Sequence, residues 1–228
     1  IKWSCDHGAD ISQNSWGYDY DLNNDGEITG EELEAIKNAT IPSSLKEAID
    51  YFVKYAGCDN NGNQLPNSPM KGGLVVFAAG NDNVPYCNPS YYDKIMAVTS
   101  VGSDYRRAYY SSYGDWADII APGGDAMKGF QVLSTLPGNK YGDMQGTSMA
   151  CPHVSGVAAL IVANLGGEGF TVERLRELLL GTASSKVLEY NTLPIGVGLV
   201  NAADAIDGNR SVVHDLTLAG PDKMNVKL

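Results

Sequence analysis

The apolar run at residues 74–79 is the strongest constraint on how this chain can fold. Its letters, LVVFAA, include no polar side chain, and the run ends at Gly80 and Asn81. A strand that is apolar at every position must be buried on both faces, which is typical of a parallel sheet covered by helices on each side. The run therefore predicts an α/β protein, a three-layer α/β/α sandwich with a mostly parallel sheet.

The other segments alternate between helix-like and strand-like patterns. Apolar residues recur with helical spacing over 43–56, with Ser44 and Glu47 as a capping box and Gly57 as the stop. The segment 148–164 is apolar on almost all sides, so we expect a central, buried helix there. Further helices are expected at 171–180, capped by Thr171, and at 201–206. Further strands are expected at 9–15, 94–101, 117–121 and 131–135.

The chain length suits one sizeable core. We expect a single domain over residues 1–208 of the 228, interrupted by a polar, acidic insert at 18–41. The tail at 209–228 alternates apolar and polar residues again, which indicates the start of a following β domain.

Charge, hydropathy and cysteine content narrow the range of partners. The formal net charge is −11, so the phosphate backbone of a nucleic acid would be repelled. We expect no membrane span, because the longest apolar run, 154–165, has the length of one buried helix. The four cysteines fit no zinc-binding spacing, and the sequence selects none of their three complete disulfide pairings. Cys151 lies in an apolar helix, and we expect it to be reduced.

The string GTSMACPHV at residues 146–154 contains the candidate catalytic residue of the chain. It places Ser148 at the start of a buried helix, where backbone N–H groups and the helix dipole stabilise negative charge. Pro152 is tolerated only near a helix start, so the helix must begin close to Ser148. Gly146 allows another chain to approach closely. On its own, such a serine is most often a helix cap.

The complete string resembles the nucleophile signature of the subtilisin-like serine proteases, the subtilases. The strand 75–81 is similar to the family's strand that leads to its oxyanion asparagine, and NSWG at 14–17 looks like one wall of the substrate cleft. Further landmarks follow in the family's order at 111–114, 119–123 and 198–202.

The resemblance implies roles for individual residues. Ser148 would be the nucleophile, and Asn81 would donate its side-chain amide to the oxyanion together with the Ser148 N–H. Substrate would bind as an extended strand, and Cys87 would approach the floor of a side-chain pocket. The residues expected to contact substrate are Ser15, Trp16, Gly17, Ala79, Gly80 and Gly146.

The aspartate and histidine of the family's triad have no counterpart here. In subtilases both precede the nucleophile, and the stretch before Asn14 matches neither motif. His7, His153 and His214 are the chain's histidines, and none is placed to serve Ser148. The chain is therefore interpreted as an N-terminally truncated fragment of a serine endopeptidase, inactive alone, with the missing N-terminal part as its partner.

Two alternatives remain open. One is a calcium-stabilised pseudoprotease or peptide-binding module, and the other is an enzyme whose second chain supplies the aspartate and histidine. The family resemblance implies a secreted, periplasmic or cell-surface location. A sheet edge left uncovered by the missing part would favour self-association.

The acidic insert contains a second motif, DLNNDGEITGEE at residues 21–32. Its oxygen-bearing residues, with Gly26 at the sixth position, match an EF-hand calcium loop, and a helix is expected to follow over 31–37. The segment before the loop is too short for the full incoming helix of an EF-hand. The loop therefore resembles the half EF-hand of a dockerin-type repeat. The alternative is a solvated acidic turn. Bound Ca²⁺ would rigidify the cleft wall, and its expected ligands are Asp21, Asn23, Asp25, Glu27, Thr29 and Glu32.

Overall fold

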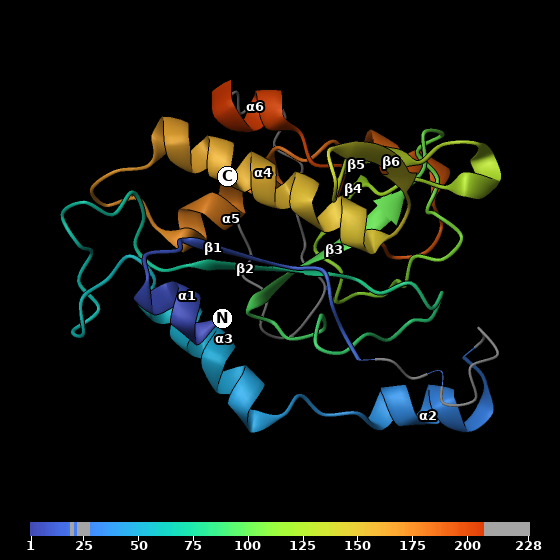
Figure 1. Ribbon diagram of the computed structural model, residues 1–228, viewed down its shortest axis with the longest axis horizontal. Helices are drawn as coiled ribbons and strands as arrows, with labels where there is room; N and C mark the ends of the chain where they lie inside the picture. Colours follow the sequence, from blue (N-terminus) through green and yellow to red (C-terminus); the bar gives the residue numbers. More distant parts are fainter. Residues whose placement is uncertain (19–20, 22–27, 208–228) are drawn as a thin grey trace.

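The computed structural model describes residues 1–18, 21 and 28–207. The expected β strand in the tail at 209–228 and most of the calcium loop lie outside these residues. Four parallel strands form the central sheet in the order β1-β2-β3-β4 (Figure 1). Their bounds are Ile11–Asn14 for β1, Leu74–Ala78 for β2, Ile95–Val101 for β3 and Ile119–Pro122 for β4.

Alternate residues of β2 point into the two helical layers. Val76 packs with α4 (Thr147–Leu165), α5 (Val172–Gly181) and α6 (Ala202–Asp207), whereas Phe77 packs with α1 (Lys2–Asp6) and α3 (Ser43–Tyr55). Successive side chains of a strand face opposite sides, so an apolar run such as β2 fills both cores. This arrangement confirms the predicted α/β/α sandwich. The remaining helix, α2 (Gly30–Asn38), lies at the edge of the molecule (Figure 1).

Helix α3 confirms the prediction for 43–56, but its expected capping box is wrong. The helix begins at Ser43 with Pro42 as the N-cap, and the Pro42 carbonyl accepts the Leu45 and Lys46 N–H groups. Ser44 is therefore already inside the first turn, where a side chain cannot act as N-cap. Gly57 follows with φ +67°, a left-handed conformation that ends the helix as predicted.

Helix α4 is central, but the expectation that it is buried on all sides is wrong. Val154, Ala158 and Ile161 are fully buried against the sheet, whereas Leu160 is 47% exposed and Leu165 41%. By length and composition α4 could cross a membrane, which corrects the expectation that no run is long enough. Core helices of folded domains meet the same test, and α4 packs against all four strands of the sheet.

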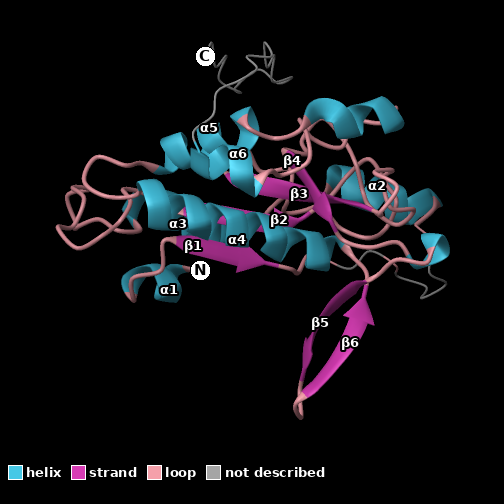
Figure 2. Ribbon diagram, turned by 90° about the horizontal axis from the view of Figure 1, so that it is seen from above, coloured by secondary structure: helices cyan, strands magenta, loops and turns pink. Residues whose placement is uncertain are grey.

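The strand expected at 131–135 is present, but it does not join the central sheet. It forms β5 (Val132–Leu136), which pairs antiparallel with β6 (Lys140–Met144) in a hairpin that projects from the body (Figure 2). The connecting turn contains Gly138 and Asn139, both with positive φ, which is typical of hairpin turns. Two short 3₁₀ helices, Ala126–Lys128 and Ser185–Tyr190, complete the described elements.

Candidate active site

Loops at the carboxyl ends of β1 and β2 meet the N-terminus of α4. In a parallel sheet, loops that follow neighbouring strands lie at the same edge, which is where α/β proteins bind ligands. A cavity of about 280 Å³ opens at this edge. It is lined by Ser15, Trp16, Gly17, Tyr18, Ala78, Gly80, Asn81, Asp82, Cys87, Thr147 and Ser148.

Most of the predicted site residues meet in this cavity, and two do not line it. Ala79 is fully buried, with its N–H donated to the Val98 carbonyl, and Ala78 lines the cavity instead. Gly146 is buried behind Ser148 at the N-cap of α4. The lining also includes three residues that were not predicted from the sequence, Tyr18, Asp82 and Thr147. Each of them adjoins a predicted site residue.

Thr147 fixes the orientation of the Asn81 side chain. The backbone N–H and the Oγ1 of Thr147 each lie 2.9 Å from Asn81 Oδ1, and Oγ1 accepts the Gly80 N–H at 3.1 Å. A backbone N–H can only donate, so the Asn81 atom facing it must be the carbonyl oxygen. The Asn81 Nδ2 is consequently turned away from Thr147.

Two N–H donors lie next to Gly146. A Cβ built on Gly146 would lie 3.6 Å from Asn81 Nδ2, 3.6 Å from Ser148 N and 3.7 Å from Asn81 Oδ1. Ser148 is in the first turn of α4, where backbone N–H groups have no acceptor within the helix. Gly146 has φ +146°, in the region that favours glycine. The arrangement can therefore accept a developing negative charge close to the Ser148 hydroxyl.

The segment that includes Ser15 and Trp16 is attached directly to α4. Ser15 Oγ donates to the Ser148 carbonyl at 2.9 Å. The Trp16 indole N–H donates to Asn14 Oδ1 at 3.1 Å, and its ring meets the edge of Phe77 at a centroid distance of 4.9 Å. These contacts hold one wall of the cavity in place beside Ser148.

Cys87 lies in the cavity lining, in line with the expectation that it approaches the pocket floor. A Cβ built on Gly80 would come within 3.1 Å of Cys87 Sγ and 3.5 Å of Asp82 Oδ2, so both side chains converge on the space that Gly80 leaves. Burial raises the pKa of the Cys87 thiol to about 11, because the buried thiolate would lose its hydration. No disulfide links the cysteines, all of which lie in the described part of the chain.

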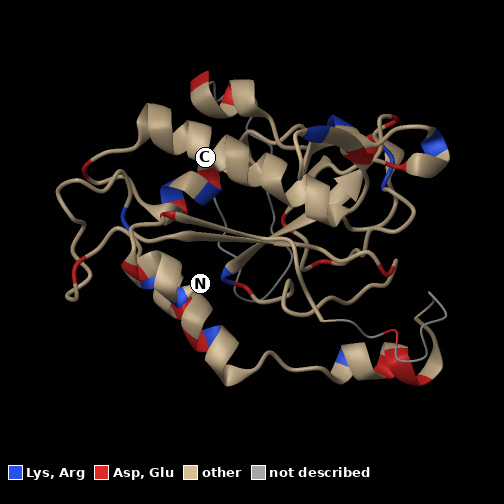
Figure 3. Cartoon of the chain, in the orientation of Figure 1, with Lys and Arg blue, Asp and Glu red and all other residues tan. Residues whose placement is uncertain are grey.

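The calcium loop is described only in part. Asn23, Asp25 and Glu27 lie outside the described residues, and Asp21, Thr29 and Glu32 lie within them. Helix α2 confirms the helix expected over 31–37, and Glu31 and Glu32 lie in its first turn (Figure 3). Glu32 is buried, and its Oε2 accepts the Thr29 N–H at 3.3 Å. The described residues contain no cluster of three acidic, histidine or cysteine side chains that could hold a metal.

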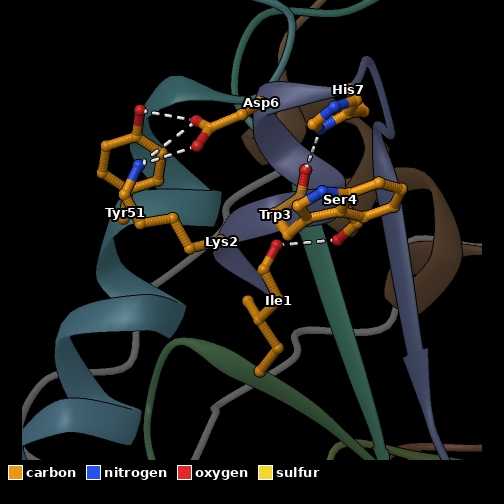
Figure 4. A network of polar contacts seen from close by, with 7 residues as sticks. All are labelled: Ile1, Lys2, Trp3, Ser4, Asp6, His7 and Tyr51. Atoms are coloured by element: carbon orange, nitrogen blue, oxygen red, sulfur yellow. Dashed lines mark hydrogen bonds and ion pairs between the residues drawn. The ribbon is translucent and has the colours of Figure 1, made fainter.

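Neither described histidine reaches Ser148. His7 stacks on Trp3 with ring centroids 4.1 Å apart, and its Nδ1 lies 2.8 Å from the Trp3 carbonyl (Figure 4). It belongs to the α1 region before β1, at the opposite end of the sheet (Figure 1). His153 Nδ1 lies 2.8 Å from the Met149 carbonyl on the exposed side of α4, so this ring is not placed to serve Ser148, in line with the expectation from the sequence. His214 lies outside the described residues.

Comparisons with known proteins find several similar proteases. The chain is 42% identical over 137 residues to an alkaline elastase of Bacillus sp. (strain YaB), covering 59% of this chain and 33% of the elastase. It is 33% identical over 174 residues to an extracellular basic protease of Dichelobacter nodosus, covering 72% of this chain and 28% of that protease. A solved protease of Pseudoalteromonas arctica superposes with a TM-score of 0.59 at 35% identity, covering 75% of this chain and 48% of that structure.

The matched part is less than half of each of these relatives. The family model of the subtilases matches residues 1–209, which is nearly the whole chain. A match of this extent, together with the parallel sheet and the serine at the start of α4, shows that the chain belongs to the subtilase family.

Proposed function

We propose that this chain is part of a serine endopeptidase in which Ser148 Oγ attacks the carbonyl carbon of a peptide bond. The resulting oxyanion accepts hydrogen bonds from Asn81 Nδ2 and the Ser148 N–H. Its collapse expels the amine, which takes up the proton released by Ser148, and leaves an acyl group on Ser148. The observation that carries this proposal is the anchoring of Asn81 by Thr147, which presents the amide nitrogen before substrate arrives. Donors held in place in this way need no reorganisation during the reaction.

The proton of Ser148 has no acceptor among the described histidines, because neither His7 nor His153 lines the cavity. We propose that the rest of the protease supplies the histidine and aspartate. The chain alone is then inactive, because an unassisted serine hydroxyl is a weak nucleophile. Its partners would be a peptide or protein substrate and the remaining part of the catalytic domain.

The domain would extend over residues 1–208, with the calcium loop inserted at 18–41 and the tail at 209–228 outside it. Substrate would lie along Ser15, Trp16 and Gly17 in an extended conformation. Strand β1 pairs only with β2 among the described strands, so its other edge offers a place for the rest of the sheet or, in the isolated chain, for a second copy. The extracellular relative from Dichelobacter nodosus supports a secreted, periplasmic or cell-surface location.

Ca²⁺ fits the chemistry of the 21–32 loop, because all of the proposed donors are oxygen atoms. Asp21, Asn23, Asp25 and Glu32 would supply side-chain oxygens, Glu27 a backbone carbonyl, and Thr29 a direct or water-mediated contact. Support comes from α2, which begins at Gly30 as expected for the helix that leaves such a loop. The ion would stiffen the insert next to the cavity wall at Gly17.

The experiment compares peptide hydrolysis by the chain alone with hydrolysis by the chain joined to the upstream part of its own gene product, called here the joined protease. We expect turnover only in the joined protease, and we expect Ser148→Ala to abolish it. Turnover by the chain alone that Ser148→Ala abolishes would contradict the inactive-fragment proposal.

A peptide-binding module is the second candidate function, favoured by the lack of a histidine among the residues that line the described cavity. Peptide binding without turnover in both proteins would support this alternative and contradict the endopeptidase proposal.

A further inference from the structure

Two of the cysteines share a second cavity, away from the candidate active site. Cys5 and Cys58 both line a cavity of about 390 Å³, which also includes Asp10, the residue before the first residue of β1. Cys5 lies on α1 and is buried, whereas Cys58 follows α3 and is only partly buried. Both are free thiols in this structure.

The surroundings of the two thiols place them near each other. Cys5 belongs to the core cluster that contains Ala56, and Cys58 Sγ donates to the Ala56 carbonyl at 3.4 Å. Burial raises the pKa of the Cys5 thiol, and the charges of Asp6 and of an ionised Cys58 raise it further. Such an influence acts only over a short distance, because water and dissolved ions screen it.

The two segments that carry the thiols are held together by other contacts. On α1, Asp6 accepts a hydrogen bond from the Tyr51 hydroxyl at 2.8 Å, and Lys2 Nζ lies 3.6 Å from the centre of the Tyr51 ring (Figure 4). Tyr51 belongs to α3, so these contacts keep α1 against the helix that Cys58 follows. A disulfide forms without strain only where the backbone already brings the two cysteines close together.

The other two cysteines lie at the opposite end of the sheet. Cys151 is buried in α4, with its Sγ 3.7 Å from the carbonyl of Asn14, the last residue of β1. The cavity of Cys5 and Cys58 lies beyond the first residue of this strand, which spans about 10 Å. Cys87 lines the candidate active-site cavity instead. Cys58 is therefore the partner available to Cys5.

We propose that Cys5 and Cys58 are an oxidisable pair that joins α1 to the end of α3 by a disulfide. The more exposed Cys58 attacks a small disulfide as its thiolate, forms a mixed disulfide and releases one thiol. The Cys5 thiolate then attacks the Cys58 sulfur and releases the second thiol. The two electrons and the two protons of the pair end on the released thiols. Disulfides of this kind persist in oxidising compartments such as the cell exterior.

The bond would attach a weakly held helix to the core of the domain. Helix α1 has five residues, and a helix of this length has little stability of its own. A disulfide also restricts the unfolded chain, so oxidation should raise the melting temperature by about 5–10 °C. The inference is independent of the proposed function, because it uses neither Ser148 nor a bound peptide.

The test treats the reduced full chain with 2-hydroxyethyl disulfide at about pH 8.5, near the pKa of a free thiol. This oxidant is uncharged, which suits a cavity lined by Asp6, Asp10 and Asp59. Mass spectrometry without reductant should show the loss of two hydrogen atoms and a linked pair of peptides that contain Cys5 and Cys58. The melting temperature should rise on oxidation and return to its first value after dithiothreitol.

Three variants separate this pair from the other thiols. Cys5→Ser should retain a mixed disulfide at Cys58, because the thiol that resolves it is gone. Cys58→Ser should leave the buried Cys5 largely unmodified. Cys87→Ala is the matched control, and it should still form the bond and show the rise in melting temperature. Circular dichroism checks that each variant is folded.

Three results in the wild-type chain would overturn the inference. One is a stable mixed disulfide at Cys58 with no linked peptides. Another is a linked pair of peptides that contains Cys87 or Cys151 in place of Cys5 or Cys58. The third is a chain in which Cys5 and Cys58 both remain reduced in excess oxidant.

Discussion

Thr147 holds the side-chain oxygen of Asn81 with two donors, its backbone N–H and its Oγ1, each at 2.9 Å. The same Oγ1 accepts the Gly80 N–H, so one buried hydroxyl connects the end of β2 to the start of α4. The orientation of Asn81 therefore depends on a residue that makes no contact with the proposed oxyanion. The first prediction follows from this link.

Thr147→Val should lower the turnover of the joined protease by roughly tenfold, since Asn81 loses one of its two anchors and Gly80 N–H loses its acceptor. The free energy of unfolding should fall by about 1–3 kcal/mol, because a buried donor is left unsatisfied. Kinetics and urea unfolding measure the two effects. Thr147→Ser keeps the hydroxyl and serves as the control, and turnover at the wild-type level in Thr147→Val would show that the anchor is dispensable.

Asn81→Ala should reduce kcat of the joined protease by about 10²–10³ with little change in KM, the range known for removing this kind of donor in a subtilisin. The reason is that the amide contacts the oxyanion and not the ground-state substrate. Steady-state kinetics give the split between kcat and KM. A rise in KM at constant kcat would instead assign Asn81 to substrate binding.

Cys87 should react slowly with iodoacetamide at neutral pH. With a pKa of about 11, its thiolate fraction at pH 8 is about a hundredfold lower than that of a free thiol, and the rate should climb until the pH passes the pKa. Mass spectrometry of the labelled peptide follows the reaction, with glutathione as the reference thiol. A rate that levels off below pH 9 would show that burial does not suppress the thiolate.

Two glycines should respond to alanine in opposite directions. A Cβ on Gly73 would lie 2.5 Å from Phe52 Cδ1 and 2.7 Å from the Cβ of Ala56, so Gly73→Ala should destabilise the fold by about 1–3 kcal/mol. Gly156 lies within α4 with open space around it, so Gly156→Ala should stabilise it by about 0.5–1 kcal/mol. Urea unfolding measures both, and destabilisation by Gly156→Ala would contradict the exposed face of α4.

Ca²⁺ should raise the melting temperature of the chain by several degrees when it is present at about 100 times its Kd, equivalent to roughly 2.7 kcal/mol. Glu32→Gln should remove most of the shift, because Glu32 is the proposed bidentate ligand. Glu34→Gln, an acidic neighbour on α2 outside the ligand set, provides the matched control. A melting temperature that does not change with Ca²⁺ would show instead that the insert is a solvated acidic turn.

The sequence predicted the elements whose pattern is local. Strand β2 is apolar at each position, as a strand covered on both faces must be, and α3 has a clear helical period. The sequence of each segment was therefore enough to predict the element that it forms. The antiparallel partner of β5 could not be predicted in this way, because strand pairing depends on where the chain turns. The turn signal of Gly138 and Asn139 was overlooked. The exposed side of α4 also escaped prediction, because apolar residues there resemble core residues.

At the end of β2, the expected site residues and the residues that line the cavity differ by one position. Ala79 was expected in the lining and Ala78 occupies that place, because adjacent residues of a strand face opposite sides and a one-residue error reverses the side. Thr147 and Asp82 were missed for another reason. Their places at the cavity follow from contacts with Asn81 and from the space beside Gly80, and no spacing in the sequence indicates such contacts.

The hydrogen bond between Ser15 and Ser148 joins residues that are 133 positions apart. Closing a loop of this length costs chain entropy, so we expect this contact to form late in folding. We then expect the cavity wall to reach Ser148 only after most of the sheet has assembled. A partly folded chain would then have the serine without its substrate wall, and it could bind peptide only once folding is nearly complete.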